Sequence, residues 1–186
     1  MIIDRRDALA GIATMFGAAL FAPIARAAGA QATPISDGPP SAPVFTAEQR
    51  ALVTALSERV MPTTDTPGAI AAEVPAFIEK LLADWAMAED RKPILAGLDA
   101  IEARSQADYK IAAANATPEQ QDALLTLALE NKLPGGWDFF DKFRQLVITG
   151  YFTSEIGITQ EREYLPVPGR YDGAYPYSQV NKVFSS

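Results

Sequence analysis

Apolar residues recur at helical spacing in five stretches of the chain, and turn residues separate the stretches. The stretches cover residues 46–61, 71–87, about 90–114, 117–131 and 137–152. In the first, Leu52, Leu56 and Val60 fall on one face because an α-helix repeats about every 3.6 residues. The pattern predicts an all-α fold, a compact bundle of about five helices.

Local signals mark where these helices begin and end. Thr46 is followed three residues later by Gln49, and Thr117 by Gln120, a spacing that predicts a reciprocal capping box at each helix start. The loop after the first helix carries Pro-Gly turn signals at residues 62–69. Pro75 then fits the second helix only if it lies in the first turn.

The fifth predicted helix is apolar over more than one face, through residues such as Phe139, Phe143 and Val147. A helix of this kind is either central to its own core or buried against another chain. We expect Trp85 and Trp137 to be core residues, with an interface as the alternative for Trp137. Tyr109 and Ile111 are expected on the buried face of the third helix.

The last part of the chain, from about residue 153, forms no periodic pattern. It is an irregular arm in which tyrosines alternate with proline and glycine, most densely over residues 164–177. Tyrosine buries a large apolar area while its hydroxyl keeps a polar partner, so such an arm is typical of a surface that covers another protein. The alternative is that the arm folds back over its own helices.

The first 27 residues have the three parts of an export signal. Arg5 and Arg6 precede an uncharged run over residues 8–25, and small residues at Ala25 and Ala27 predict cleavage after Ala27. Paired arginines predict the twin-arginine route, which passes folded proteins, although Asp4 stands where a hydroxyl residue is usual. An uncleaved membrane anchor and an ordinary secretory signal are the alternatives. Residues 28–44, rich in Pro, Ser and Gly, predict a flexible linker, and the domain follows from residue 45 to 186.

Composition removes several function classes. The chain has a net charge of −7, which argues against nucleic acid and anionic membrane surfaces as partners. It has no Cys and no His, so it has no thiolate metal site, no disulfide and no histidine base. We therefore expect no catalytic, cofactor-binding or metal-binding residue in this chain, and contact with a membrane only through a complex or an uncleaved leader.

A few residues suggest chemistry, but each has a simpler structural explanation. Asp65 sits between prolines and is read as a turn or cap residue. Asp138 and Asp141 are expected in the first turn of a helix, where the dipole favours acids. A small carboxylate-based hydrolase and a structural helical protein without an enzyme partner remain alternative functions.

Five segments in combination resemble the gluconate 2-dehydrogenase subunit 3 family. They are the twin-arginine leader, LSERVMPTTDTPGA at 56–69, EVPAFIEKLLADW at 73–85, FRQLVITGYFTSEIG at 143–157 and YLPVPGRYDGAYP at 164–176. Each pattern is weak alone, but their order and combination are specific. The similarity runs from about Phe45 to Pro176.

The resemblance implies a role in a periplasmic complex that oxidises a sugar or glycoside. It implies that a glucose-methanol-choline type flavoprotein holds FAD and catalyses the reaction, and that a haem c subunit or a quinone-linked carrier takes the electrons. The chain described here would be the non-catalytic small subunit, which brings the flavoprotein through twin-arginine export and stabilises it.

From the leader, the proline-containing loop at residues 62–69, the end of the fifth predicted helix and the arm we predict two sets of functional residues. Arg5 and Arg6 form the export signal. The partner-binding residues are Pro62, Pro67, Gly68, Tyr151, Phe152, Tyr164, Pro166, Pro168, Tyr171 and Tyr175.

Overall fold

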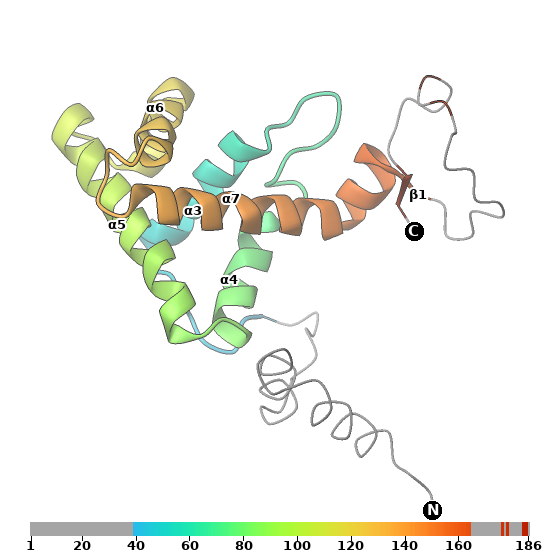
Figure 1. Cartoon of the computed structure of the whole chain (residues 1–186), viewed down its shortest axis with the longest axis horizontal. Coiled ribbons are helices and arrows are strands. Elements are labelled where there is room, and N and C mark those ends of the chain that lie inside the picture. Colours follow the sequence, from blue (N-terminus) through green and yellow to red (C-terminus); the bar gives the residue numbers. More distant parts are fainter. Residues whose placement is uncertain (1–38, 165–175, 177, 179–183, 186) are drawn as a thin grey trace, which may run out of the picture. The chain divides into compact units, whose positions relative to one another are not determined.

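The computed structural model describes residues 39–164, 176, 178, 184 and 185. The contacts divide the chain into residues 1–38 and 39–186, and every described residue belongs to the second unit. The predicted leader, including Arg5 and Arg6, lies outside the described residues. With the labels of Figure 1, the α-helices are α3 (Ala47–Val60), α4 (Val74–Asp84), α5 (Ala88–Tyr109), α6 (Pro118–Leu129) and α7 (Gly136–Thr153). The predicted all-α bundle of five helices is confirmed.

Both predicted capping boxes are present. At the start of α3, the Thr46 hydroxyl accepts from the Gln49 N–H at 3.2 Å, and the Gln49 side chain accepts from the Thr46 N–H at 3.2 Å. Thr117 and Gln120 make the same pair of bonds before α6, at 3.3 and 3.0 Å. These bonds satisfy N–H groups that no helical carbonyl reaches, so the sequence itself sets where both helices begin.

The middle helices differ from the prediction at their ends. A left-handed residue precedes α4, namely Glu73 with φ 56°, so this helix begins three residues later than expected and Pro75 falls in its first turn. Lys110, with φ 63°, ends α5 five residues early. The turn that follows leads into the short 3-10 helix η1 (Ala113–Asn115), and it leaves Ile111 37% exposed rather than buried as predicted.

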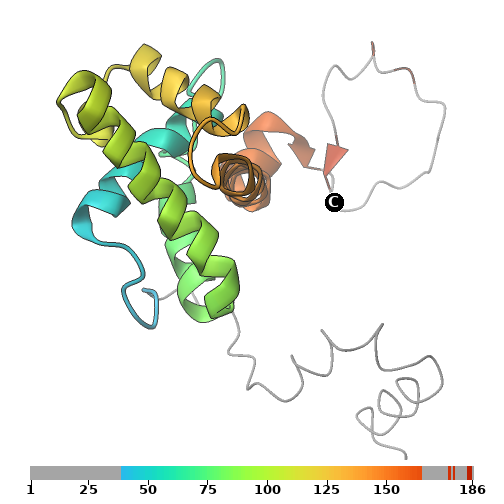
Figure 2. The same cartoon turned by 60° about the vertical axis from the view of Figure 1, so that its left-hand side comes forward.

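Helix α7 lies at the centre of the bundle and contacts all four other α-helices. Figure 1 shows α7 crossing in front of α3, with α5 and α6 near its beginning and α4 below it, and Figure 2 shows the same bundle viewed nearly along α7. Its fully buried side chains, Phe139, Phe143, Val147 and Tyr151, recur every four residues and form one ridge. The first two rings stack with centroids 5.4 Å apart. The prediction of a central fifth helix is confirmed.

Helix α5 approaches this ridge closely at Gly97. A Cβ atom at residue 97 would overlap the ring of Phe139, which is itself fully buried. The glycine is therefore required by the distance between two helices, although glycine inside a helix usually costs stability.

The two tryptophans are not core residues, contrary to the prediction. Trp85 is 49% exposed at the end of α4, and Trp137 is 52% exposed at the start of α7. Both stand at helix ends, where the apolar stripe continues past the point at which neighbouring helices cover it. Whether a neighbouring helix covers each position therefore decides its burial, and the spacing of apolar residues alone does not predict it.

Residues 39–45 are held on the helices, so the flexible linker predicted for 28–44 extends too far. The Ser41 N–H donates to Asp84 Oδ1 at 3.0 Å, and Lys80 Nζ donates to the Pro39 carbonyl at 3.3 Å. Phe45 is buried in the core just before α3.

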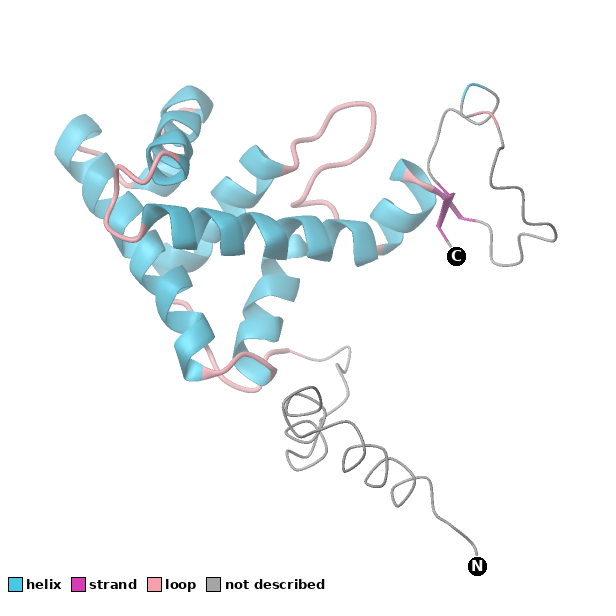
Figure 3. Cartoon of the chain, viewed as in Figure 1, coloured by secondary structure: helices cyan, strands magenta, loops and turns pink. Residues whose placement is uncertain are grey.

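After α7 the chain forms one turn of π-helix, η2 (Gly157–Glu161), instead of continuing irregularly as predicted. Two short strands follow, β1 (Glu163–Tyr164) and β2 (Phe184–Ser185). They pair in parallel, with Glu163 opposite Phe184, so the end of the chain returns to the beginning of the arm. Figure 3 shows that helices dominate the part of the chain that is coloured.

We predict that Gly97→Ala destabilises the fold by about 1 to 3 kcal/mol, because the new methyl group overpacks against Phe139. Helix propensity alone predicts the opposite sign, since Ala is the better helix former. Chemical denaturation followed by circular dichroism measures the difference. Restoring room with Gly97→Ala and Phe139→Leu together should recover part of the loss, and a Gly97→Ala variant as stable as the parent would contradict the packing.

Candidate functional site

The structure brings together half of the predicted partner-binding residues. Pro62, Pro67 and Gly68 lie in the loop between α3 and α4, residues 61–73, which we call the proline loop. Tyr151 and Phe152 lie in the last turn of α7, next to that loop. Of Tyr164, only the backbone in β1 is described, and Pro166, Pro168, Tyr171 and Tyr175 lie outside the described residues.

The carboxylate of Glu58, near the end of α3, organises the proline loop. Its Oε1 accepts from the Thr63 N–H at 2.9 Å and from the Thr63 hydroxyl at 2.8 Å. Its Oε2 accepts from the Ile70 N–H at 2.9 Å. The Thr63 hydroxyl also accepts from the Gly68 N–H at 2.9 Å, so one side chain on a helix fixes both ends of the loop.

Tyr151 and Glu161 join the proline loop to α7 and η2. The Tyr151 hydroxyl donates to the Pro67 carbonyl at 2.8 Å, and the Thr66 hydroxyl donates to Glu161 Oε2 at 2.7 Å. These bonds connect residues more than 80 positions apart in the sequence. The loop is therefore presented on a rigid base rather than left as an extended surface segment.

Burial separates the predicted residues into two groups. Tyr151 is only 1% exposed, and Gly68 is buried against the Glu58 carboxylate. Direct contact of these two with a partner does not agree with their burial, so their part is to shape the loop. Pro62 is exposed, and Pro67 and Phe152 are partly exposed. The surface that they offer also includes the exposed side chain of Ile70.

Phe152 is held in a defined orientation at this surface. Its ring meets the Tyr151 ring edge to face, with centroids 5.3 Å apart, and the Arg162 guanidinium lies 4.7 Å from its centroid. A guanidinium at this distance is attracted by the π face of the ring. Phe152 thus combines an apolar face with a fixed positive charge.

Several described carboxylates are held in hydrogen bonds that lower their pKa values. The Arg50 hydrogen bond lowers the pKa of Glu79, and the Arg59 hydrogen bond lowers the pKa of Asp122. A glycosidase acid needs a raised pKa. On the surface of α7, Asp138 pairs with Lys142 at 2.8 Å and Asp141 pairs with Arg144 at 3.1 Å.

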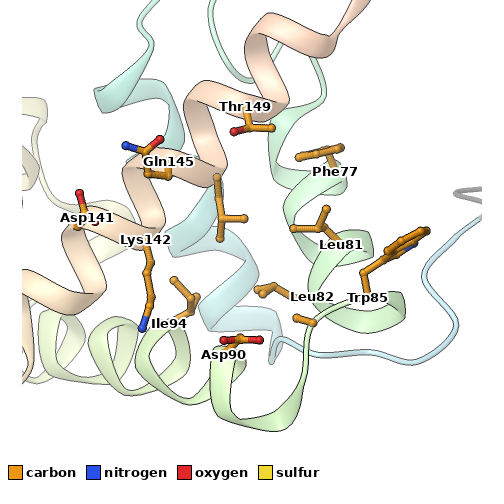
Figure 4. A pocket seen from close by; sticks show the side chains of 12 residues that line it. Phe77, Leu81, Leu82, Trp85, Asp90, Ile94, Asp141, Lys142, Gln145 and Thr149 are labelled. Carbon is orange, nitrogen blue, oxygen red and sulfur yellow. The ribbon is translucent and has the colours of Figure 1, made fainter. Parts of the chain in front are cut away.

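A second feature, an open groove of about 510 Å³, was missed by the sequence analysis. It runs between α4 and α7, with the start of α5 closing one end (Figure 4). Its apolar lining is Phe77, Leu81, Leu82, Trp85, Ala86, Ile94 and Leu146, and its polar lining is Asp90, Asp141, Lys142, Gln145 and Thr149. The sequence feature that could have indicated the groove is the apolar stripe on α4, which is wider than the surface that α7 alone covers.

The groove and the proline loop are both set by the same end of α7. Thr149 lines the groove, and Tyr151, two residues on and therefore nearly on the opposite side of the helix, holds the loop. Between them, Gly150 packs so closely on α4 that a Cβ there would lie 2.7 Å from the Phe77 ring, which also lines the groove. One helix therefore positions both features.

The described residues form neither a cluster of metal ligands nor a membrane-spanning helix. In that part of the chain, no three acidic side chains converge as metal ligands would. No helix there is long and apolar enough to cross a membrane.

Comparison with known proteins finds a family match for the helical part of the chain. The family model described as gluconate 2-dehydrogenase subunit 3 matches residues 47–169, from the first residue of α3 into the arm. No curated protein and no solved structure matches the chain. The match includes the proline loop, all five α-helices and the groove.

We predict that Glu58→Gln destabilises the chain by about 1 to 2 kcal/mol at neutral pH, because an amide turns one N–H group toward the N–H donors of the loop. Burial raises the pKa of Glu58, but the hydrogen bonds from Ile70 and Thr63 outweigh it and lower the pKa below 4.5. A carboxyl group whose pKa is lower in the folded than in the unfolded state stabilises the fold at pH values above its unfolded pKa. This stabilisation is lost as the pH falls through the folded pKa.

The difference between parent and variant should therefore be constant near neutral pH and shrink below about pH 4.5. Denaturation curves recorded across that range measure it. The exposed Glu155→Gln serves as the matched control and should change little. A gap that stays the same down to pH 3 would show that the Glu58 carboxylate does not hold the loop.

Proposed function

The chain belongs to the gluconate 2-dehydrogenase subunit 3 family, and we propose that it is the small subunit of a periplasmic FAD-dependent dehydrogenase that oxidises a sugar or a glycoside. The observation that carries this proposal is the family match over residues 47–169, which spans all the described α-helices. Membership of this family indicates that the chain is an accessory subunit of a dehydrogenase complex. The substrate class, cofactor and compartment are our inference.

The catalytic chemistry belongs to a partner subunit in this proposal. A glucose-methanol-choline type flavoprotein holds FAD and oxidises the substrate, and a haem c subunit takes the electrons. Two properties of the small subunit support this division. It has no His and no Cys, and its described carboxylates with shifted pKa values are held in structural hydrogen bonds.

The second part of the proposed role is export. Arg5 and Arg6 precede an uncharged run that ends near small residues, as expected for a twin-arginine signal. This route carries proteins that are already folded, and a flavoprotein must fold around FAD before it crosses the membrane. The small subunit would then provide the export signal for both chains and reach the periplasm with its partner.

The proline loop and the end of α7 provide the contact surface, together with the tyrosines and prolines of the arm. Pro62, Pro67, Phe152 and Ile70 offer apolar area on a base that Glu58 and Tyr151 keep rigid. A rigid surface loses little conformational entropy on binding, which favours a stable complex.

Purification of the full chain from its native source tests the complex directly. We predict that a flavoprotein co-purifies in stoichiometric amount and that the preparation shows flavin absorbance and oxidises a sugar in the presence of an electron acceptor dye. Sizing chromatography should give one peak that contains both chains. A chain that elutes alone, without flavin, would contradict the proposed function.

Changing Arg5 and Arg6 to Lys together tests the export role. We predict that the co-expressed flavoprotein then remains in the cytoplasm, because the receptor for folded cargo reads the arginine pair. Fractionation followed by flavin and activity measurements locates it. Arg26→Lys keeps the same charge outside the pair and should have no effect, whereas equal periplasmic activity with and without the pair would contradict the escort role.

A further inference from the structure

The groove between α4 and α7 has an exposed apolar rim at the corner where α4 meets α5. Trp85, the residue that ends α4, is 49% exposed, and Met87, the residue that precedes α5, is 46% exposed. Both side chains lie at the corner between α4 and α5, and Trp85 also lines the groove (Figure 4). A large aromatic side chain at the rim of an apolar groove is the kind of residue that anchors protein complexes.

The charges around the groove leave one carboxylate uncompensated. Lys142 pairs with Asp138 at 2.8 Å, and Asp141 pairs with Arg144 at 3.1 Å, so the α7 side is balanced. On the other side, no ion pair is recorded for Asp90 among the described residues. Its neighbour Arg91 donates instead to the carbonyls of Ala83 and Ala86. The groove therefore presents apolar area and, among its lining residues, a single acidic group without an ion pair.

The position of the groove ties it to the proposed contact surface. Phe77 lines the groove and packs on Gly150 of α7. Thr149, which also lines the groove, lies three residues before Phe152 and therefore on the same side of the helix. A partner that contacts Phe152 would reach the groove within one turn of α7.

We propose that the groove receives an amphipathic helix of the catalytic flavoprotein subunit. Apolar side chains of that helix pack on Phe77, Leu81 and Trp85, and an Arg or Lys beside them pairs with Asp90. Charge complementarity and the open shape between two helices favour this occupant over a purely apolar one. The inference rests on the proposed function, because the family match is what introduces the partner subunit.

A second copy of the chain fits the groove less well. In a twofold contact the same surface faces itself, so each groove would have to receive an element of the identical patch. The lining of the groove offers the Asp90 carboxylate but no cation that lacks an ion pair. In a twofold contact the two Asp90 carboxylates would therefore lack a counter-charge. The charge pattern therefore favours a different chain with a basic residue.

The test uses the co-expressed full-length complex, with Trp85→Ala and Asp90→Lys made separately in the small subunit. We expect Trp85→Ala to weaken binding to the flavoprotein about 30-fold, the effect of losing an aromatic anchor. Asp90→Lys should weaken it at least about tenfold and reduce the dependence of affinity on salt, because it replaces an attraction by a repulsion.

Two matched controls show whether the effects are local. Trp137→Ala removes an equally exposed tryptophan at the start of α7, and Asp108→Lys reverses a charge at the opposite end of α5. Both should bind within about threefold of the parent, which is the range of surface substitutions outside a hot spot. Circular dichroism and thermal unfolding of each variant should show that all four keep the fold.

The outcomes separate this inference from the proposed function. If the parent chain binds the flavoprotein but the two groove variants bind equally well, the groove proposal is wrong and the proposed function stands. If the groove variants instead abolish a dimer of the small subunit on a sizing column, the occupant is a second copy. If the parent chain itself binds no flavoprotein, the proposed function fails, and the proposed occupant fails with it.

Discussion

Burial of one ridge on α7 is the constraint on which the rest of the structure depends. Phe139, Phe143, Val147 and Tyr151 project from the same side of this helix at four-residue intervals, and each is almost completely shielded from solvent. The other helices can enclose the ridge only if they come very close to it, and Gly97 on α5 permits that approach at Phe139. Because all four neighbouring helices contact α7, the helix defines the position of every other element in the bundle.

The same helix connects the core to the proposed function. Tyr151 ends the buried ridge, and its hydroxyl leaves the apolar core to bind the Pro67 carbonyl of the proline loop. Residues on a neighbouring face of α7, including Leu146 and Thr149, line the groove. A change in the core would therefore shift the loop and the groove together, and a partner bound at either would in turn stabilise the core.

Particular residues show how far the sequence determines this picture. The capping pairs at Thr46 and Thr117, the first-turn position of Pro75 and the central place of α7 follow from local spacing and are confirmed. The end of α5 was wrong because a left-handed Lys110 carries no clear signal, and the burial of Trp85 and Trp137 was wrong because periodicity does not show where a neighbouring helix stops. The proline loop was predicted as a site, but Glu58, which holds it, was not. Its three hydrogen bonds join a helix to residues 5 and 12 positions away, and nothing local to Glu58 indicates them.

The central claim is that the two features organised by α7, the proline loop and the groove, bind a catalytic dehydrogenase subunit. Hydrogen exchange of the small subunit, measured alone and in the purified complex, tests it most directly. The account predicts slower exchange in the complex at residues 61–73 and at the corner over 85–91, with no change in α6, which contributes no residue to either feature. Protection of α6 with unchanged exchange at the loop and the corner would contradict it.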